Sequence, residues 1–343
     1  MGTSGICTTS LTFSTERSKY VNFMKIRASP VFVTLKHKNN SESAEIKCPD
    51  FYVNSRSFHG DIVTFTCYDR MAFADAVKFY EKDFLSENQK DAVQYTTGKA
   101  LFDMANTKLG TSGTADFGAV WDAVNRIPTD SIIGQTVSQV LQTLSEILCG
   151  VFFVDNENRL IFCRFDRQCN IGGSVNDYSE PDIGDTLTVG QYRITSSNDT
   201  ESEYTSDENG VILTVNGATM THEQSAELMG KEVCGKTYTY GTIDNILLGW
   251  IPQINSKLTL GGGGELLINN ISLDISVCGI IGSVAANEAG GNEIADYMGR
   301  LTLELEKSLK SGDRIGTNTI ITKYQGIVQV DSEEYEKWKG GAS

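Results

Sequence analysis

The chain is most constrained by residues 60–76, where a strand-like stretch runs directly into a helix-like one. β-Branched and aromatic residues dominate positions 62–68, as in a half-buried strand, whereas Met71 and the three alanines that follow it favour helix. Tyr68 and Asp69 lie between the two stretches and predict a tight turn. We therefore expect a β domain to end here, with Asp69 as a turn former and not as a catalytic carboxylate.

Short strands with polar connections are predicted before this junction. The first of them begins so near the start of the chain that we expect another segment or another subunit to supply a sheet edge. This size and pattern predict a small antiparallel barrel or sandwich. The expected strands are residues 9–14, 31–37, 44–48, 51–54 and 61–68, with a hairpin connection at 38–41.

Two helices are predicted after the junction. Residues 97–109 place apolar side chains on one helical face, and Gly110 can end that helix. Residues 136–149 carry a cleaner apolar stripe, and Thr136 with Gln139 predicts a capping box at its start. The periodicity has changed from that of a strand to that of a helix, which indicates a separate subdomain.

A hairpin is expected to follow the second helix directly. Gly150 is predicted to take the left-handed position that ends the helix. Residues 151–154 and 159–165 then predict two strands, and the Asp and Asn residues of 155–158 are typical of the turn between them. Helix and hairpin together predict a small α+β unit.

The remainder of the chain returns to β patterns before a different ending. A helix is expected at 220–233, and the acidic run 198–210 is interpreted as an exposed loop. The other expected elements are strands at 191–196, 212–215, 236–242, 257–260, 265–269 and 272–277, a helix at 292–311, strands within 314–330 and a frayed tail at 333–343.

The predicted fold class is α+β and mainly β. It comprises two small tube-like antiparallel β-barrel domains, an intervening helix–hairpin α+β subdomain, and a C-terminal helix with strands. The predicted domains are 1–71 for the first tube-like domain, 72–175 for the helix–hairpin subdomain, 176–290 for the second tube-like domain and 291–343 for the C-terminal part.

Charge and hydropathy limit the partners of the chain. The 44 acidic residues outnumber the 29 basic ones and give a formal charge of −15, which argues against a surface that binds nucleic-acid phosphates. The first thirty residues lack the pattern of a signal sequence, and no stretch is apolar enough for a spanning helix. We therefore expect assembly in a cytoplasm, without membrane insertion by this chain, and buried thiols as the default state of the eight cysteines.

No residue is assigned a catalytic, cofactor-binding or metal-binding role. The spacing of the three histidines matches no metal motif, and His222-Glu223 is not followed by a second histidine. Cys149, Cys163 and Cys169 form the one thiol cluster of the sequence, and free thiols are favoured over a zinc site. The histidines are His37, His59 and His222.

Glycine-rich stretches do not predict chemistry either. Residues 110–113 and 2–5 lack the strand-to-helix context of a nucleophile elbow. Residues 261–264 lie between two expected strands and are interpreted as a hairpin tip, not as a phosphate cradle. The acidic run 198–210 lacks the residue order of a calcium loop. The sequence therefore predicts neither a cofactor nor a metal.

The junction at 65–75, the helix–hairpin 136–165 and the late β block together resemble the baseplate or tail hub proteins of bacteriophages and phage-tail-like particles, of the Gram-positive host type. In that family a first β domain ends in a Tyr-Asp turn, which Thr66 to Asp69 match here. The helix and hairpin match 137–148, 151–154 and 159–165, and the late strands match 238–242, 247–252 and 257–277.

The resemblance implies a structural hub without enzymatic activity or cofactor. Such a hub is a homotrimeric ring that joins the six-fold tail tube to a three-fold spike or tail tip and holds the end of the tape-measure protein. Asn255-Ser256 replaces the Gly-Asp pair usual in the family, and the sequence carries no peptidase or muramidase domain. Its expected location is the tail baseplate of a virion or a phage-tail-like particle.

Two other functions remain open at this stage. The first is a tail-tip enzyme that degrades peptidoglycan with a pair of carboxylates. The second is a carbohydrate-binding tail module in which Trp121, Trp250 and Trp338 form stacking platforms. Phage, contractile bacteriocin and injection device also stay open as the particle, and so does the presence of a contractile tail.

Overall fold

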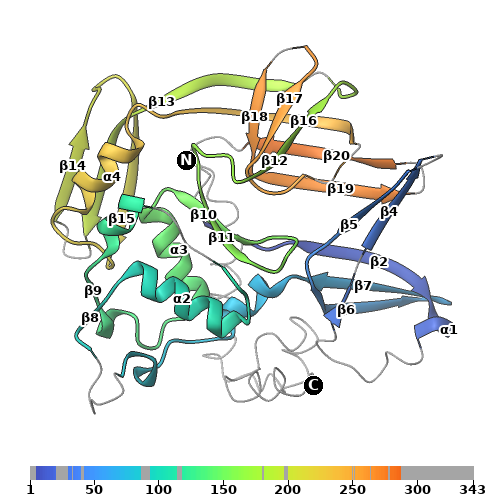
Figure 1. Ribbon diagram of the computed structural model, residues 1–343, viewed down its shortest axis with the longest axis horizontal. Coiled ribbons are helices and arrows are strands. Elements are labelled where there is room, and N and C mark those ends of the chain that lie inside the picture. The colour runs from blue at the N-terminus through green and yellow to red at the C-terminus, as the bar shows by residue number, and fades with distance from the viewer. Residues whose placement is uncertain are drawn as a thin grey trace.

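The computed structural model is an α+β fold that is mainly β, as the sequence predicts (Figure 1). The predicted helix at 292–311, the strands within 314–330 and the tail at 333–343 lie outside the residues it describes. It describes residues 5–20, 30–32, 34–39, 42–85, 93–113, 118–179, 181–196, 200–248, 250, 252–262, 264–276 and 279–286.

The first β unit is an antiparallel sheet with the strand order β2-β7-β6-β3. Its strand β7 buries Val63, Phe65 and Cys67 in regular alternation, and Ile62 at its start is 42% exposed. The elements of this unit are β2 (Ser10–Glu16), α1 (Arg17–Tyr20), β3 (Pro30–Val31), the hairpin of β4 (Thr34–Asn39) and β5 (Glu42–Lys47), β6 (Phe51–His59) and β7 (Ile62–Tyr68).

The α+β unit follows the Tyr-Asp turn and holds both predicted helices. Its sheet has the order β1-β10-β11, in which the first strand of the chain pairs in parallel with β10. Its main elements are β1 (Gly5–Cys7), α2 (Gly98–Leu109), α3 (Val137–Ile147), β10 (Gly150–Val154) and β11 (Leu160–Arg164). Short 3-10 helices η2 (Arg70–Asp75), η3 (Glu81–Phe84), η4 (Gly118–Val124) and η5 (Thr129–Ser131) and the strand pair β8 (Tyr95–Thr96) and β9 (Ile127–Pro128) complete it.

The predicted helix ends are confirmed at three of four positions. Gly110 ends α2 in the left-handed conformation, with φ 64°. Thr136 and Gln139 form the reciprocal capping box of α3. The fourth expectation is wrong, because Cys149 takes the left-handed conformation after α3, with φ 54°, and Gly150 already belongs to β10.

Close packing of strands explains the glycine at 150. A Cβ atom at this position would lie 2.4 Å from the carbonyl oxygen of Cys163 and 2.5 Å from the ring of Phe162. Gly150→Ala should therefore lower the free energy of unfolding by about 2 kcal/mol, as overpacking does in closely packed sites. Gly60→Ala is the control for denaturant unfolding, since its Cβ would have no neighbour within 4 Å although its φ is 59°. Equal effects of the two substitutions would contradict this explanation.

The second β unit consists of two packed sheets with a helical lobe at one end (Figure 1). The sheet β12-β17-β18 packs over the sheet β14-β13-β16-β20-β19, and α4 packs against β13 and β14. The elements are β12 (Asn170–Val175), β13 (Asp182–Ser196), β14 (Glu201–Thr205), β15 (Val211–Ala218), α4 (Ser225–Val233), β16 (Thr237–Leu248), β17 (Ser256–Leu260), β18 (Glu265–Ile268), β19 (Asn270–Ser276) and β20 (Gly279–Ala286).

The acidic run 198–210 is not simply a loop, because β14 runs through it. Glu201 and Glu203 alternate on this strand and form ion pairs with Arg193 of β13, at 2.7 and 3.1 Å. Arg193 on the neighbouring strand thus offsets part of the negative charge of this run. That negative charge was the reason for predicting a loop. Expecting an exposed loop over the whole run was wrong.

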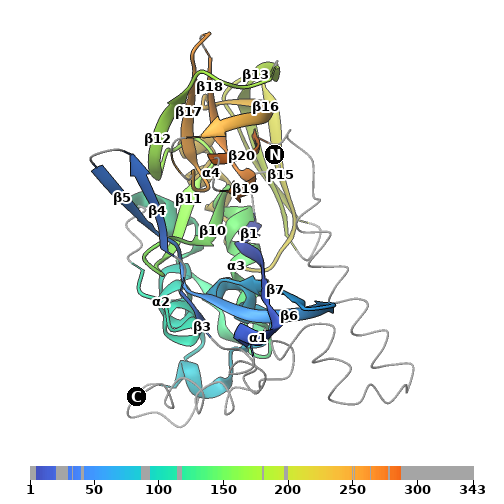
Figure 2. The same cartoon turned by 90° about the vertical axis from the view of Figure 1, so that its right-hand side faces the viewer.

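One hydrophobic core joins the α+β unit to the second β unit. It runs from Phe152 and Leu141 through Tyr192 to Ile246 and Leu258. The first β unit has its own smaller core around Val63 and other buried residues of β6 and β7. Figure 2 shows the sheet β2-β7-β6-β3 on one side of α3, β10 and β11 and the second β unit on the other, while the hairpin of β4 and β5 extends toward the second β unit. Within the described ranges, the helices are too short or too polar to span a membrane.

Candidate functional site

Asp69 stands at the junction between the first β unit and the α+β unit. Its carboxylate accepts hydrogen bonds from the backbone N–H of Thr9 at 2.7 Å and of Met71 at 3.0 Å, and its side chain is fully buried. The second bond caps η2, so Asp69 forms the turn as the sequence predicts. The first bond joins the chain entering β2 to the chain leaving β7. We call this set of contacts the Asp69 junction.

Arg70 extends the Asp69 junction toward α2. Its guanidinium donates to the carbonyl of Gly110 at 2.7 Å, lies 3.6 Å from the carboxylate of Asp50, and stacks 5.6 Å above the ring of Tyr52. The orphan carbonyl at the end of α2 is therefore satisfied by a residue that also contacts the first β unit. The orientation of the two units is fixed by polar contacts as well as by apolar packing.

Burial makes the Asp69 carboxyl unusual. Desolvation raises the pKa of Asp69 to about 7, against the hydrogen bonds from Thr9 and Met71, which lower it. Burial also raises the pKa of the Cys7 thiol to about 12, with a smaller contribution from the charge of Asp69. The surroundings of Asp69 consist of backbone donors that hold a turn, which is the arrangement of a structural carboxyl.

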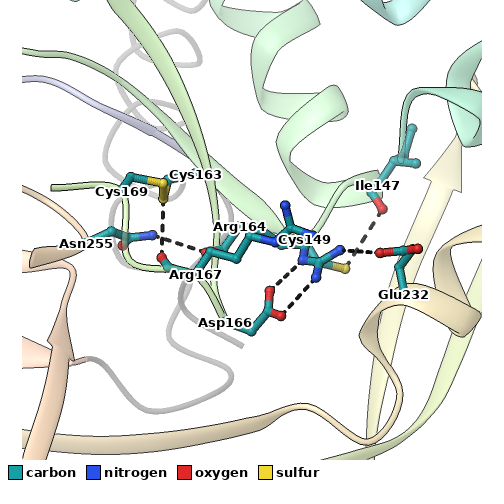
Figure 3. Close-up of polar contacts among 9 residues, drawn as sticks. All are labelled: Ile147, Cys149, Cys163, Arg164, Asp166, Arg167, Cys169, Glu232 and Asn255. Atoms are coloured by element: carbon teal, nitrogen blue, oxygen red, sulfur yellow. Dashed lines mark hydrogen bonds and ion pairs between the residues drawn. A yellow bond between two sulfur atoms is a disulfide. The ribbon is translucent and has the colours of Figure 1, made fainter. Parts of the chain in front are cut away.

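A second polar cluster joins the α+β unit to the second β unit, and Figure 3 shows it in detail. Arg164, at the end of β11, is 5% exposed and forms a two-pronged pair with Asp166, at 2.5 and 2.9 Å. Its third contact is Glu232 of α4, at 3.1 Å. The carbonyl of Arg164 accepts a hydrogen bond from the side-chain amide of Asn255, at 3.3 Å. We call these four residues the Arg164 junction.

A disulfide lies beside the Arg164 junction. It links Cys163 to Cys169, whose Cα atoms are 6.1 Å apart, so the expectation of free thiols at these two positions is wrong. Cys149, the third member of the predicted cluster, is free and buried. The two partners are six positions apart in the sequence, with Cys163 in a predicted strand, and this spacing does not show that their side chains face each other.

The remaining residues singled out from the sequence do not converge. His37 lies on β4, His59 ends β6, and His222 stands before α4, where its Nε2 lies 2.8 Å from the carbonyl oxygen of Asp122. Gly261 and Gly264 belong to the β17–β18 turn, as predicted. In the part of the chain that the structure describes, no group of three or more His, Cys, Asp or Glu residues is placed to hold a metal ion.

Two of the three tryptophans, Trp121 and Trp250, are packed against the core and do not form carbohydrate platforms. Trp121 lies against the core with its ring 6.2 Å from that of Phe102. Trp250 also packs against the core, at a point where a Cβ on Gly173 would be 2.3 Å from its indole ring. Trp338 lies outside the described residues. Neither described indole stands as an open stacking face.

Among the described residues, each sheet has terminal strands, which have a neighbour on one side. Pairs of hydroxyl groups lie on exposed faces of the first sheet and of the second β unit. β2 is a terminal strand of the first sheet, and Ser14 and Thr64 share a hydrogen bond of 2.8 Å on its exposed face. Thr186 and Thr239 form the same contact at 2.8 Å on the second unit. A terminal strand such as β2 can pair with another chain through its backbone groups.

The apolar face of the first sheet is covered only in part. Leu11, Phe13 and Val31 pack against the small core of this unit while remaining partly exposed, and Phe32 is 73% exposed. We call Leu11, Phe13 and Val31 the half-covered face, and Phe32 is the exposed residue that directly follows Val31. A face of this kind is typical of a surface that another protein covers.

Sequence reasoning missed Arg164, Asp166 and Glu232. The available signal was a charged residue at the end of an otherwise apolar strand, since β11 reads Leu-Ile-Phe-Cys-Arg. Such an arginine needs a buried partner, because an unpaired buried charge is costly. Glu232 lies 68 positions away, so the sequence alone did not identify it.

No protein-family model and no curated protein match this sequence. Among solved structures, the chain is similar to the 43 kDa tail protein of prophage MuSo2 from Shewanella oneidensis, with 13% identity and a TM-score of 0.43 over 81% of this chain and 88% of that one. It is similar to a tail protein from Neisseria meningitidis MC58, with 10% identity and a TM-score of 0.43 over 82% and 92%. It is also similar to prophage tail protein gp18 from Listeria monocytogenes EGD-e, with 11% identity and a TM-score of 0.44 over 86% and 92%.

Proposed function

We propose that this protein is a structural component of a bacteriophage tail or phage-tail-like particle, where it serves as the baseplate or tail hub. The observation that carries the proposal is the pair of β units with terminal strands, whose sheets lie on either side of α3, β10 and β11 of the α+β unit. The sequence resemblance of the junction, the helix–hairpin and the late strands to tail hub proteins of the Gram-positive host type supports the same function.

The proposed assembly is a homotrimeric ring. Three copies would present six β units to the six-fold tail tube, so that the ring adapts six-fold symmetry above to a three-fold spike or tip below. The half-covered face of each first β unit is covered by the next subunit, and terminal strands such as β2 pair through their backbone groups. Neither contact requires a cofactor or catalysis.

The proposed lumen holds the end of the tape-measure protein and lets a polyanion pass. The formal charge of −15 and the hydroxyl-bearing sheet faces support this, because acidic and neutral polar surfaces do not retain nucleic-acid phosphates. The chain would then be a part of the virion tail without enzymatic turnover.

The native mass of the full chain tests the ring directly. We expect sedimentation and native mass spectrometry to give three times the mass of one chain, and we expect cosedimentation with purified tail tube protein of the same particle. Phe32→Asp should weaken trimer formation by about tenfold or more, because it places a charge directly beside Val31 of the half-covered face. Its stability as a monomer should change little, since Phe32 is 73% exposed.

Ile212→Asp is the matched control, because Ile212 is a 44% exposed apolar residue of β15 on the other β unit. It should leave the mass unchanged if the half-covered face is the contact. A monomer at high concentration that also fails to bind tube protein would overturn the hub. Clearing of cell-wall material in a zymogram, abolished by a single carboxylate substitution, would favour the enzyme instead.

A further inference from the structure

The two sulfur-bearing residues of the disulfide differ in their access to solvent. Cys163 is 1% exposed and belongs to a small apolar cluster with Val151 and Phe153, whereas Cys169 lies in an exposed stretch of the loop before β12. A dissolved thiol can therefore approach the bond from the side of Cys169. The geometry favours one order of attack, with Cys169 as the sulfur that is attacked and Cys163 as the sulfur that leaves.

We propose that Cys163–Cys169 is a thiol–disulfide exchange site for low-molecular-weight thiols, and that its redox state controls how firmly the second β unit is held on the α+β unit. The bond closes a loop between β11 of the α+β unit and β12 of the second β unit. This inference does not depend on the proposed function, because it concerns contacts within one chain.

The closed loop holds the segment that leads into β17. The backbone N–H of Cys169 donates to the carbonyl of Asn255 at 3.3 Å, and the side-chain amide of Asn255 donates to the carbonyl of Arg164 at 3.3 Å. Asn170 adds a bond from its side chain to the carbonyl of Ile254, at 2.6 Å. Both ends of the loop therefore contact the same segment, and the disulfide keeps those ends together (Figure 3).

The structure already provides a hydrogen-bond acceptor for the Cys163 thiol of the reduced state. The Sγ atom of Cys163 lies 3.3 Å from the carbonyl oxygen of Arg167, so a thiol at this position has a hydrogen-bond acceptor already in place. Reduction would leave Cys163 where it is and release the exposed Cys169. We infer that opening loosens the contacts at Asn255 while the core shared by the two units stays folded.

The exchange balances with two molecules of thiol. One thiolate attacks the sulfur of Cys169 and forms a mixed disulfide, while Cys163 leaves as a thiolate and takes up a proton. A second thiolate attacks the mixed disulfide, releases Cys169 as a thiol, and forms the small-molecule disulfide. The two electrons and two protons come from the small thiol, and the small disulfide reverses the reaction.

Hydrogen exchange of the full chain, measured in excess reduced or oxidised glutathione, tests the proposal. Peptides that contain the amides of Cys169 and Asn255 should exchange about tenfold faster or more in the reduced sample, because the loop no longer holds them. Peptides of β2 and β7 should exchange equally in both. Alkylation followed by mass spectrometry should find two more thiols, at Cys163 and Cys169, after reduction.

Cys169→Ser should show the faster exchange in both buffers, and Cys48→Ser should keep the wild-type response because Cys48 is a free cysteine of the first β unit. Equal exchange of wild-type protein in the two buffers would overturn the proposal. Alkylation of both Cys163 and Cys169 in oxidised glutathione would do the same. The wild-type comparison decides the matter even if the serine variant fails to fold.

Discussion

Asp69→Ala is expected to lower the free energy of unfolding by about 3 kcal/mol at pH 6, because the substitution leaves two backbone donors without their acceptor. The donors are the N–H groups of Thr9 and Met71, and Asp69 itself is fully buried. Denaturant unfolding followed by circular dichroism measures the change. Asp61→Ala is the control, since Asp61 lies exposed in the turn between β6 and β7 and should change stability by less than about 0.5 kcal/mol.

The contribution of Asp69 to the free energy of unfolding depends on pH through the charge of its carboxyl group. Measuring stability against pH therefore distinguishes the effect of this charge from the effect of the hydrogen bonds. Asp69 has a pKa of about 7 in the folded protein against an ordinary value of 3.8, so between these values the folded state binds a proton that the unfolded state has lost. The contribution of Asp69 to stability must therefore fall as pH rises from about 4 to 7.

Asp69→Asn replaces the titratable carboxyl with an amide, which does not ionise and keeps one oxygen as a hydrogen-bond acceptor. We expect the stability advantage of wild-type protein over Asp69→Asn to shrink by about 2 kcal/mol between pH 5 and pH 8. An advantage that stays constant or grows over this range would show that the carboxyl is ionised throughout and that burial does not dominate its pKa.

Arg164→Ala is expected to lower the free energy of unfolding by about 4 kcal/mol, because it leaves a buried carboxylate without its cation. Asp166 has a side chain that is 9% exposed and depends on the guanidinium of Arg164 at 2.5 Å. The loss should also loosen α4, which reaches the junction through Glu232. Urea unfolding of the full chain, with the fluorescence of its tryptophans as the probe, measures the effect.

Lys231→Ala provides the matched control on the same helix. Lys231 pairs with Glu227 at 2.5 Å, but both side chains are more than half exposed, so its loss should leave the free energy of unfolding almost unchanged. Arg164→Met combined with Asp166→Asn should recover part of the stability, since it removes both charges of the pair. If Arg164→Ala and Lys231→Ala lowered the free energy of unfolding equally, burial would not make the ion pairs of the Arg164 junction more important for stability than an exposed pair.

Local signals were read correctly from the sequence. Thr136 and Gln139 are three positions apart, and the capping box they form depends on nothing outside that helix turn. The turn at Asp69 is local in the same sense, although its bond to Thr9 spans 60 positions. The fold class follows from such signals, because strand and helix periods are properties of short segments.

Contacts between distant segments account for what was missed. Nothing near Gly5 indicates that the first strand pairs in parallel with β10, and β14 depends on Arg193 of a neighbouring strand. Gly150 was assigned to a helix end, whereas the need for glycine comes from Phe162 and Cys163 on the next strand. The domain limits, the trimer and the tube, spike and tape-measure partners stay predictions.

The pairing of β1 with β10 has a consequence for how this protein can change over time. Because β1 already belongs to the α+β sheet, the whole first β unit is an insertion between Thr9 and Asp69. These two residues are joined by backbone hydrogen bonding, with the N–H of Asp69 3.0 Å from the carbonyl oxygen of Thr9. Among the buried residues that the structure assigns to the main core, Tyr52 is the one that lies in this insertion, so a different module with adjacent ends can be exchanged here at little loss to that core.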